Sequence, residues 1–503
     1  MILYEKGDDM SGLKKLLSIA AAAALGVSMA AVNVSALEAY EPYSYDRWGD
    51  AVPSQAGYTA EYIVDGNTIG CGAFSEPSDI YFSHDHKFYI ADSKNNRIVV
   101  TDVDFNLVGI IDELEYDGKK EKLKAPAGVY VDQYTKAVYI CDTENERVIK
   151  CDENGKIDRF FEKPSSELFS EELTFNPKKV ITDKAGNVYV VVQSVTKGAV
   201  MYDSKGEFLG YYGANRVEAT SKVLWNAFWN TISTEEQRAR SVKSTPTGFT
   251  SFDIDDEGFI YTVTASREVK TDAVKKLNPK GANILETLGA TETTYGDNPP
   301  AYYSLYSKES QLTDIDIGPN GEINILDFVH GRVFQYDKLA NLMFIMGGQG
   351  EQLGTFRSAQ ALETYDNKIY VIDALKNNIT VFRRTAFGEI VTKATNLYNE
   401  GFYEESYEPW KDVLKYDGNY RRAYIGIGNA LFQREDYKNA MKYYKVAISR
   451  KRYNKAYEGY RNLFLKKYFS AIVVFIVVII VFVIVYKRLK ATGRLGKKRR
   501  RRL

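Results

Sequence analysis

The sequence predicts a mainly β protein in which a six-bladed β-propeller is followed by a small all-α domain and one transmembrane helix. The first observation is a repeat: residues 123–161 follow the same order of residue types as residues 74–111, with Pro126 in the place of Pro77. The period is roughly 50 residues, and each copy holds four alternating runs of β-branched and aromatic residues, the pattern of propeller blades. A later change to helical periodicity and a charge-free apolar run near the C-terminus complete the prediction.

Four looser copies bring the expected number of blades to six. They lie at residues 176–213, 247–289, 311–348 and 355–387. The last copy lacks an outer strand, because the chain becomes helical after it. Residues 58–65 read as a strand that comes before the first blade and belongs to no blade of its own. We expect this strand to close the ring as the outer strand of blade six, which removes an exposed sheet edge.

Two turns between strands share a motif, DSKNNRI starting at Asp92 and DTENERV starting at Asp142. They resemble the NHL-repeat family of propellers, whose blades carry a D-x-x-N-x-R-[IV] signature. The resemblance covers about residues 58–387; it is strong in blades one and two, partial in blade five, and weak elsewhere. It implies an NHL-like fold. We expect its charged residues to be structural and to pair within and between blades: Asp92, Arg97, Asp142, Arg147, Asp327 and Arg332.

The segment after the propeller, residues 387–467, has helical periodicity and repeats at a spacing of 34 residues. It resembles the tetratricopeptide repeat family. The second copy carries the better match, because large and small residues stand where helix pairs pack: Tyr424, Ile427, Gly428, Leu431, Ala440, Tyr444 and Ala447. The resemblance implies a short helical stack that serves as a stalk or a docking surface for a membrane-embedded or extracytoplasmic protein partner.

Both ends of the chain predict export and anchoring in a bacterial membrane. Residues 1–36 read as a cleaved signal peptide whose natural start is either Met1 or Met10, and residues 37–57 form an aromatic N-terminal segment. Residues 468–486 are long enough and apolar enough to span a bilayer once. The tail, residues 487–503, holds ten Lys or Arg and no acidic residue, which predicts a cytoplasmic C-terminus and an extracytoplasmic propeller.

Charge and cysteine content exclude two further classes of protein. The whole chain has a formal net charge of zero, but without the signal region and the basic tail it holds 53 basic and 63 acidic residues, which argues against nucleic acid as a partner. The three cysteines do not make a disulfide framework. Pairing Asp142 with Arg147 in adjacent strands puts Cys141 and Cys151 out of register for a bridge.

The sequence offers little support for catalysis. His84 and His86 fall in a turn between the first and second strands of blade one, whereas His330 falls between the second and third strands of blade five. These turns lie on opposite faces of the disc, so we predict no His-based metal or acid–base centre, and no cofactor. The alternative, by analogy with other six-bladed propellers, is a lactonase-like metal-dependent hydrolase that holds Ca²⁺ with carboxylates in the central channel.

Two insertions indicate where a ligand binds. Residues 214–245 and 290–309 both connect a fourth strand to the next first strand, and so share the face of the turns between second and third strands. Their aromatic residues are the candidate ligand-binding set for a glycan or a protein: Trp225, Phe228, Trp229, Tyr302 and Tyr303. The alternative is that the first three pack the insertion onto the disc. We therefore predict a membrane-anchored, non-catalytic binding or scaffold protein, in its most specific form part of a carbohydrate transport system.

Overall fold

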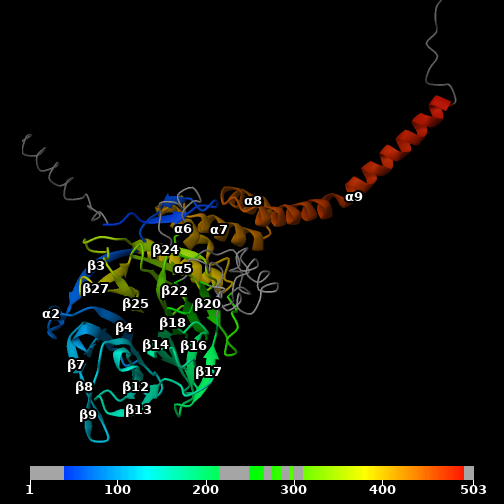
Figure 1. Ribbon diagram of the computed structural model, residues 1–503. Coiled ribbons are helices and arrows are strands. Elements are labelled where there is room, and N and C mark those ends of the chain that lie inside the picture. The colour runs from blue at the N-terminus through cyan, green and yellow to red at the C-terminus, as the bar shows by residue number, and fades with distance from the viewer. Residues whose placement is uncertain are drawn as a thin grey trace, which may run out of the picture. The chain divides into compact units, whose positions relative to one another are not determined.

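The computed structural model describes residues 39–193, 195–214, 248–265, 273–285, 295–297 and 310–491. All elements named below belong to one unit, Tyr40–Leu503. Six antiparallel sheets follow one another around a ring, in chain order (Figure 1). The fold class is therefore the predicted one, a mainly β chain with a six-bladed propeller and a C-terminal helical region.

The first three blades each have four strands. Blade one holds β4 (Pro77–Phe82), β5 (Phe88–Asp92), β6 (Arg97–Thr101) and β7 (Leu107–Ile111). Blade two holds β10 (Pro126–Val131), β11 (Val138–Asp142), β12 (Arg147–Cys151) and β13 (Ile157–Glu162). Blade three holds β14 (Asn176–Thr182), β15 (Val188–Gln193), β16 (Ala199–Tyr202) and β17 (Phe208–Tyr212). A separate hairpin, β8 (Glu113–Tyr116) and β9 (Lys119–Lys122), links the first two blades.

The remaining blades complete the ring. Blade four holds β18 (Ser251–Ile254), β19 (Ile260–Val263) and β20 (Val274–Leu277). Blade five holds β21 (Leu312–Ile317), β22 (Ile323–Asp327), β23 (Arg332–Tyr336) and β24 (Leu342–Gly347). Blade six holds β25 (Ala359–Tyr365), β26 (Lys368–Asp373) and β27 (Asn378–Arg384). The outer strand expected in blade four, which would end near residue 289, lies partly outside the described residues.

The ring closes as the sequence predicts. Strand β3 (Tyr58–Asp65) pairs antiparallel with β27, with Val64 opposite Ile379 and Tyr58 opposite Arg384. Tyr58 is fully buried, and its hydroxyl accepts hydrogen bonds from Gln335 Nε2 at 3.1 Å and from Arg384 Nε at 2.9 Å. The first described propeller strand thus completes the last blade, and the sheet edge of β27 is paired rather than exposed.

A bulge recurs near the start of the first strand in five of the blades. The pairing register shifts by one residue after Pro77, Pro126, Pro177, Leu312 and Ala359. Proline fits at three of these places, because a residue beside a bulge does not need its N–H for the ladder. The shift brings the residue that follows the bulge onto the channel side of the blade.

The strand registers also decide the state of the cysteines. Asp142 lies opposite Arg147, as expected, so Cys141 faces Val148 and Cys151 faces Val138. All three cysteines are free thiols. Cys141 and Cys151 are buried in the sheet, where they pack as small apolar residues.

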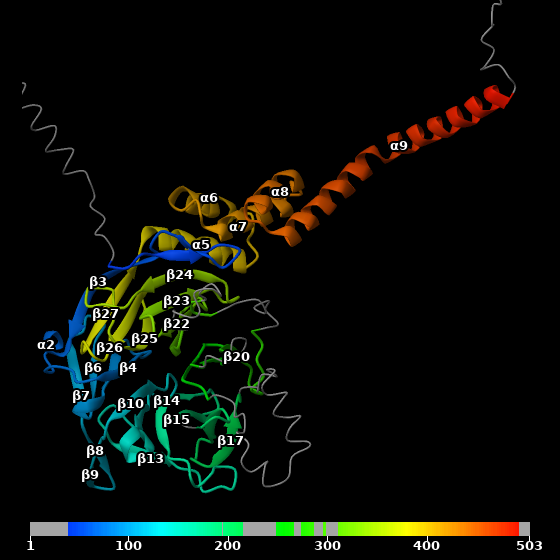
Figure 2. The same cartoon turned by 45° about the horizontal axis from the view of Figure 1, so that its top comes forward.

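A helical region follows β27 after a single residue. Its helices are α5 (Ala386–Asn399), α6 (Tyr407–Tyr416), α7 (Arg421–Gln433), α8 (Tyr437–Val446) and α9 (Arg450–Ala491). In both views α5–α8 gather beside β24 (Figure 1 and Figure 2). Consecutive helices pack through glycine against aromatic rings: a side chain at Gly428 would collide with Tyr444, and one at Gly426 with Trp410.

Polar contacts join the helical region to blade five. The buried Tyr420 hydroxyl donates to the Met343 carbonyl oxygen at 3.2 Å. Asp337, at the end of β23, accepts a hydrogen bond from Asn399 Nδ2 at 2.9 Å and forms an ion pair with Arg422. Because Asp337 is almost fully buried, these contacts attach the helices to the propeller by charge as well as by packing.

Helix α9 has 42 residues and is the one helix in the described part of the chain that is long and apolar enough to cross a membrane. Its first turns pack against α8 through the buried Ala456. Its apolar stretch, which contains the predicted span at 468–486, is not buried by the protein. The predicted signal peptide at 1–36 and most of the predicted tail at 487–503 lie outside the described residues.

We expect Tyr58→Ala to lower the stability of the propeller by about 3–5 kcal/mol, because it opens a cavity at the closure and removes the acceptor of Arg384 Nε. Tyr62→Ala, in the same strand but 38% exposed, should cost less than about 1 kcal/mol. Thermal unfolding of the two purified variants beside the unchanged protein makes the comparison. Equal effects would contradict a closure that depends on Tyr58.

Candidate functional site

The aspartate that opens each turn motif joins two loops of its blade. In blade one, Asp92 accepts the backbone N–H of Ser75 at 2.7 Å, an Asn95 Nδ2 bond at 2.7 Å and an Arg97 Nε bond at 2.7 Å. In blade two, Asp142 has the same three kinds of partner. Both aspartates are fully buried. The motif aspartate therefore binds groups of its own blade, including the loop that leads into the first strand.

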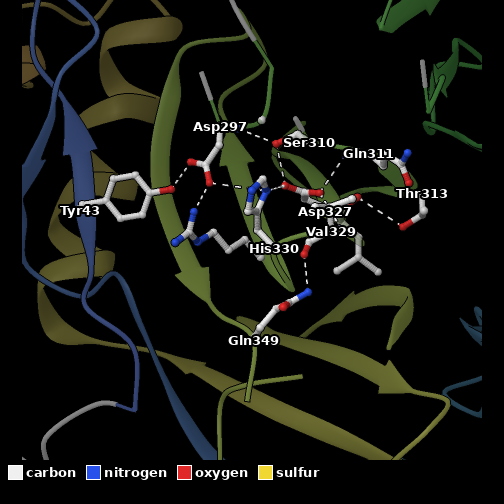
Figure 3. A network of polar contacts seen from close by, with 12 residues as sticks. Tyr43, Asp297, Ser310, Gln311, Thr313, Asp327, Val329, His330 and Gln349 are labelled. Carbon is white, nitrogen blue, oxygen red and sulfur yellow. Dashed lines mark hydrogen bonds and ion pairs between the residues drawn. The ribbon is translucent and has the colours of Figure 1, made fainter. Parts of the chain in front are cut away.

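Blade five varies this motif and forms a cluster that the sequence does not reveal (Figure 3). Asp327 accepts the N–H of Gln311 at 2.9 Å, as in the other blades, but His330 takes the place of the motif asparagine and its Nδ1 lies 2.7 Å from Asp327 Oδ2. Arg332 does not pair with Asp327. It pairs with Asp297 instead, which also accepts hydrogen bonds from the hydroxyls of Tyr43 and Tyr45.

This blade-five cluster contains one imidazole and two carboxylates whose ligand atoms lie within 4.8 Å of one another: Asp297, Asp327 and His330. Imidazole and carboxylate groups are of the kinds that bind metal ions in proteins. However, Asp297 is already satisfied by Arg332 and two tyrosine hydroxyls, so a cation would compete with a guanidinium. The hydrogen bond to Asp327 raises the pKa of His330, against the opposing effect of partial burial. The arrangement holds the N-terminal segment and Asp297 against blade five.

His84 and His86 lie in the turn between β4 and β5, and both are exposed. His330 lies between β22 and β23. The two turns are on opposite faces of the disc, as the sequence predicts, so the three histidines do not form one site.

The central channel gathers six charged side chains, of which Asp79, Asp314 and Asp316 are buried. The residues that follow the five bulges, with Ser251 at the equivalent place in blade four, form a first ring. The residues two positions further along the same strands form a second ring, because side chains alternate along a strand. The first ring consists of Asp79, Gly128, Lys179, Ser251, Asp314 and Ala361. The second ring consists of Tyr81, Tyr130, Ile181, Asp253, Asp316 and Glu363.

Lys179 lies between two carboxylates of the first ring. Its Nζ is 2.6 Å from Asp79 Oδ1 and 3.1 Å from Asp314 Oδ1. The other oxygens of these carboxylates accept backbone N–H groups of the neighbouring blades, Val129 for Asp79 and Leu362 for Asp314, both at 2.9 Å. The ion triad therefore joins blades one, three and five across the axis. Its hydrogen bonds also join blade one to blade two and blade five to blade six.

The second ring has three carboxylates and no cation of its own. Burial raises the pKa of Asp253 to about 6 and raises the pKa of Asp316 and Glu363 well above the ordinary range, with the neighbouring carboxylates adding to the effect. Burial also raises the pKa of Asp79 to about 6, against the opposing effect of Lys179. Burial alone would lower the pKa of Lys179, but Asp314 and Asp79 outweigh it and raise that pKa.

The channel is closed at this depth. The cavity that Lys179, Asp253, Asp316 and Glu363 line has a volume of about 20 Å³. A cavity needs roughly 10–15 Å³ of this kind of volume to hold one water molecule, so the space suits a single water rather than a substrate.

A larger cavity opens above the first ring, on the face that carries the turns between second and third strands. We call it the mouth pocket; its volume is about 410 Å³ and its lining includes Ser78, Ser93, Lys94, Thr143, Lys178 and Gln360. These residues come from blades six, one, two and three. The face is the one on which the sequence predicts ligand binding, but the residues are different.

The predicted ligand-binding residues Trp225, Phe228, Trp229, Tyr302 and Tyr303 lie outside the described residues. The sequence analysis missed the mouth pocket because its lining is made of isolated residues from four blades. A partial signal exists in the sequence: Lys94 and Glu144 directly follow Ser93 and Thr143 in the two best-matching turn motifs, and therefore sit on that face.

No protein-family model matches the chain, and a search of curated proteins finds no match. Solved structures of similar shape include a streptogramin B lyase, with 12% identity, 66% of this chain and 100% of that chain covered, and a TM-score of 0.40. A putative gluconolactonase has 10% identity, 69% and 98% coverage, and a TM-score of 0.38. The extracellular domain of a putative hybrid two-component system from B. thetaiotaomicron has 12% identity, 67% and 39% coverage, and a TM-score of 0.34. Values this low carry no argument about function.

We expect Lys179→Met to cost about 3–5 kcal/mol of stability at neutral pH, because it leaves Asp79 and Asp314 as uncompensated buried charges. The loss should be smaller near pH 5, since the raised pKa of Asp79, about 6, lets that carboxyl take up a proton. Lys178→Met is the matched control. Lys178 precedes Lys179 in the chain but forms no ion pair with the described residues, so its replacement should change the free energy of unfolding by no more than about 0.5 kcal/mol. Similar unfolding temperatures for the two variants would contradict the ion triad.

We expect His330→Gln to destabilise the protein more at about pH 5.5 than at about pH 8.5. The folded-state pKa of His330 is raised above its usual value near 6.5, so the stabilisation from its charge is fully present below that value and is lost as the pH rises through the folded-state pKa. Thermal unfolding at both pH values measures the difference. His84→Gln, in an exposed turn, is the control. A pH-independent effect of His330→Gln would mean that the imidazole acts through packing alone.

Proposed function

We propose that this chain is a membrane-anchored, extracytoplasmic binding protein that takes up a ligand on the propeller face bearing the mouth pocket and docks a membrane partner through its helical region. The contrast between the two cavities carries the proposal. The channel beneath is filled by an ion triad and has room for about one water, whereas the pocket above it, at about 410 Å³, is within the range of about 300–1,000 Å³ that small-molecule sites occupy.

The hydrolase alternative has one observation in its favour, the three second-ring carboxylates Asp253, Asp316 and Glu363. Carboxylates are the ligands that Ca²⁺ prefers. Lys179 works against this alternative, because its ammonium already sits between the first-ring carboxylates where a cation would enter. Recognition without catalysis therefore fits the channel better than metal-dependent hydrolysis.

The helical region supports the docking part of the proposal. Six of the seven residues named for the tetratricopeptide resemblance are buried, namely Ile427, Gly428, Leu431, Ala440, Tyr444 and Ala447, whereas Tyr424 is half-buried. Large apolar side chains nevertheless remain on its surface, with Phe402 50% and Val446 59% exposed. Helix α9 is continuous from this region into the apolar stretch, so a protein docked on α5–α8 would meet the chain beside the membrane.

The test is to label intact cells with a membrane-impermeant amine reagent, solubilise the membranes mildly, purify the full chain and identify labelled peptides and bound proteins by mass spectrometry. We expect label on propeller lysines but not on Lys487 or Lys490, and a membrane protein recovered in stoichiometric amount. A Phe402→Glu, Val446→Glu double variant should lose that protein, because each change replaces an exposed apolar side chain of the helical region with a charge.

The control places the same charges on the propeller, as Leu107→Glu and Leu209→Glu, at positions 40% and 52% exposed. This variant should keep the partner. Label on the tail lysines alone would reverse the proposed orientation. Recovery of no partner, or of the same partner from both variants, would remove the helical docking surface from the proposal.

A further inference from the structure

We infer that the mouth pocket binds a small anion rich in hydroxyl groups, of the acidic-sugar class, and that Lys94 and Lys178 bind its acid group. The inference rests on the proposed binding function and names the ligand class. It follows from three properties of the pocket: rigid walls, an excess of hydrogen-bond acceptors, and two ammonium groups that have no ion pair with the described residues.

The walls are fixed by hydrogen bonds between neighbouring blades. Ser93 Oγ, at the start of the turn after β5, donates to the Pro126 carbonyl oxygen of blade two at 2.6 Å. Thr143 Oγ1, at the same place after β11, donates to the Pro177 carbonyl oxygen of blade three at 2.7 Å. The two turns therefore hold the starts of the next blades, and the pocket needs little ordering when a ligand enters.

The same bonds use up the hydroxyl protons of the lining. A Ser or Thr hydroxyl has one proton to donate and two lone pairs to accept with. Ser78 Oγ lies 2.6 Å from Ser93 Oγ and 3.0 Å from the Ala127 carbonyl oxygen, so its proton is also taken within the protein. Gln360 uses Nε2 on Ser358 Oγ at 2.9 Å. The serine and threonine side chains therefore offer a ligand acceptors, which suit a molecule with many O–H donors, while Gln360 keeps a second N–H on Nε2.

The charges of the lining favour an anion. Lys94 and Lys178 form no ion pair or side-chain hydrogen bond with the residues that the structure describes, although both line the pocket. Of the two glutamates in the lining, Glu144 is paired with Lys124 at 3.5 Å. Two ammonium groups thus face one uncommitted carboxylate, that of Glu76. Ammonium groups bind carboxylates and phosphates as point charges, and Glu76 adds a further acceptor for ligand hydroxyls.

Two adjacent lysines of one strand, Lys178 and Lys179, have different surroundings. They are neighbours in β14 at its bulge, where the register shifts between Pro177 and Lys179. Lys179 is directed to the carboxylates of the channel, whereas Lys178 lines the pocket above. Lys179 supplies the cation that pairs with the channel carboxylates, and Lys178 has no ion pair with the described residues, so the charge of Lys178 is available to a ligand.

The experiment measures binding to the full chain, purified in detergent, by calorimetry and by the rise in unfolding temperature. The probes are D-galacturonate and D-glucuronate, with D-galactose as the neutral sugar and inorganic phosphate as the simple anion. We expect at least one uronate to bind more tightly than galactose and phosphate. The Lys94→Met, Lys178→Met double variant should weaken it at least about tenfold, since a hydrogen bond to a charged group contributes about 1.5–3 kcal/mol.

Lys205→Met is the control, because this exposed lysine lies in the turn between β16 and β17 on the opposite face of the disc. It should leave uronate binding unchanged. Equal binding of galactose would overturn the role of the two lysines, and equal binding of phosphate would overturn the role of the hydroxyl acceptors. Absence of uronate binding, or binding that the double variant retains, would overturn the inference. The proposed function fails separately, through the orientation and partner experiment on the helical region.

Discussion

The pairing of β3 with β27 is the constraint on which the rest of the structure depends. It joins residues more than 300 positions apart, as the Tyr58–Arg384 pair shows, and removes the edge that blade six would otherwise expose. It also places the start of the helical region. Thr385 Oγ1 donates to the Ala56 carbonyl oxygen at 2.7 Å, and a side chain at Gly388 would collide with the Gly57 carbonyl oxygen. The residues just before β3 therefore form the surface on which α5 begins, so ring closure and helix docking share one segment of chain.

Within the ring, the turn motif acts on neighbouring blades as well as on its own. Asp92 and Asp142 fix the loop before the first strand, and the next residues, Ser93 and Thr143, hold the following blade. Blade five keeps the aspartate but replaces the asparagine with His330 and sends its arginine to Asp297. The same turn motif thus has two roles. In blades one and two it forms rigid walls of the pocket, and in blade five it attaches the N-terminal segment through charged side chains.

The features that sequence could predict are those encoded within one period of the repeat. Strand order, the register of Asp142 with Arg147 and the missing outer strand of blade six all follow from local alternation and counting. The channel charges could not be predicted, because Lys179 meets Asp79 and Asp314 from strands 100 and 135 positions away, and only ring closure brings the three together. His330 could have been assigned to its aspartate, since it stands three residues after Asp327, at the spacing of Asn95 after Asp92. The mouth pocket had no such signal beyond the position of Lys94.

Removing the charged groups of the triad from water costs free energy, and this cost must be weighed against what the triad contributes. A buried ion pair is often no more stabilising than apolar residues of the same size, so burial of charge is a poor explanation for stability as such. Lys179 from blade three satisfies Asp79 from blade one and Asp314 from blade five only when all three stand in their observed places around the axis. An arrangement with any of these blades displaced would leave a charge buried without a partner, at a cost of several kcal/mol. The triad is therefore satisfied in the observed arrangement of the ring, on which a pocket with walls from four blades also depends.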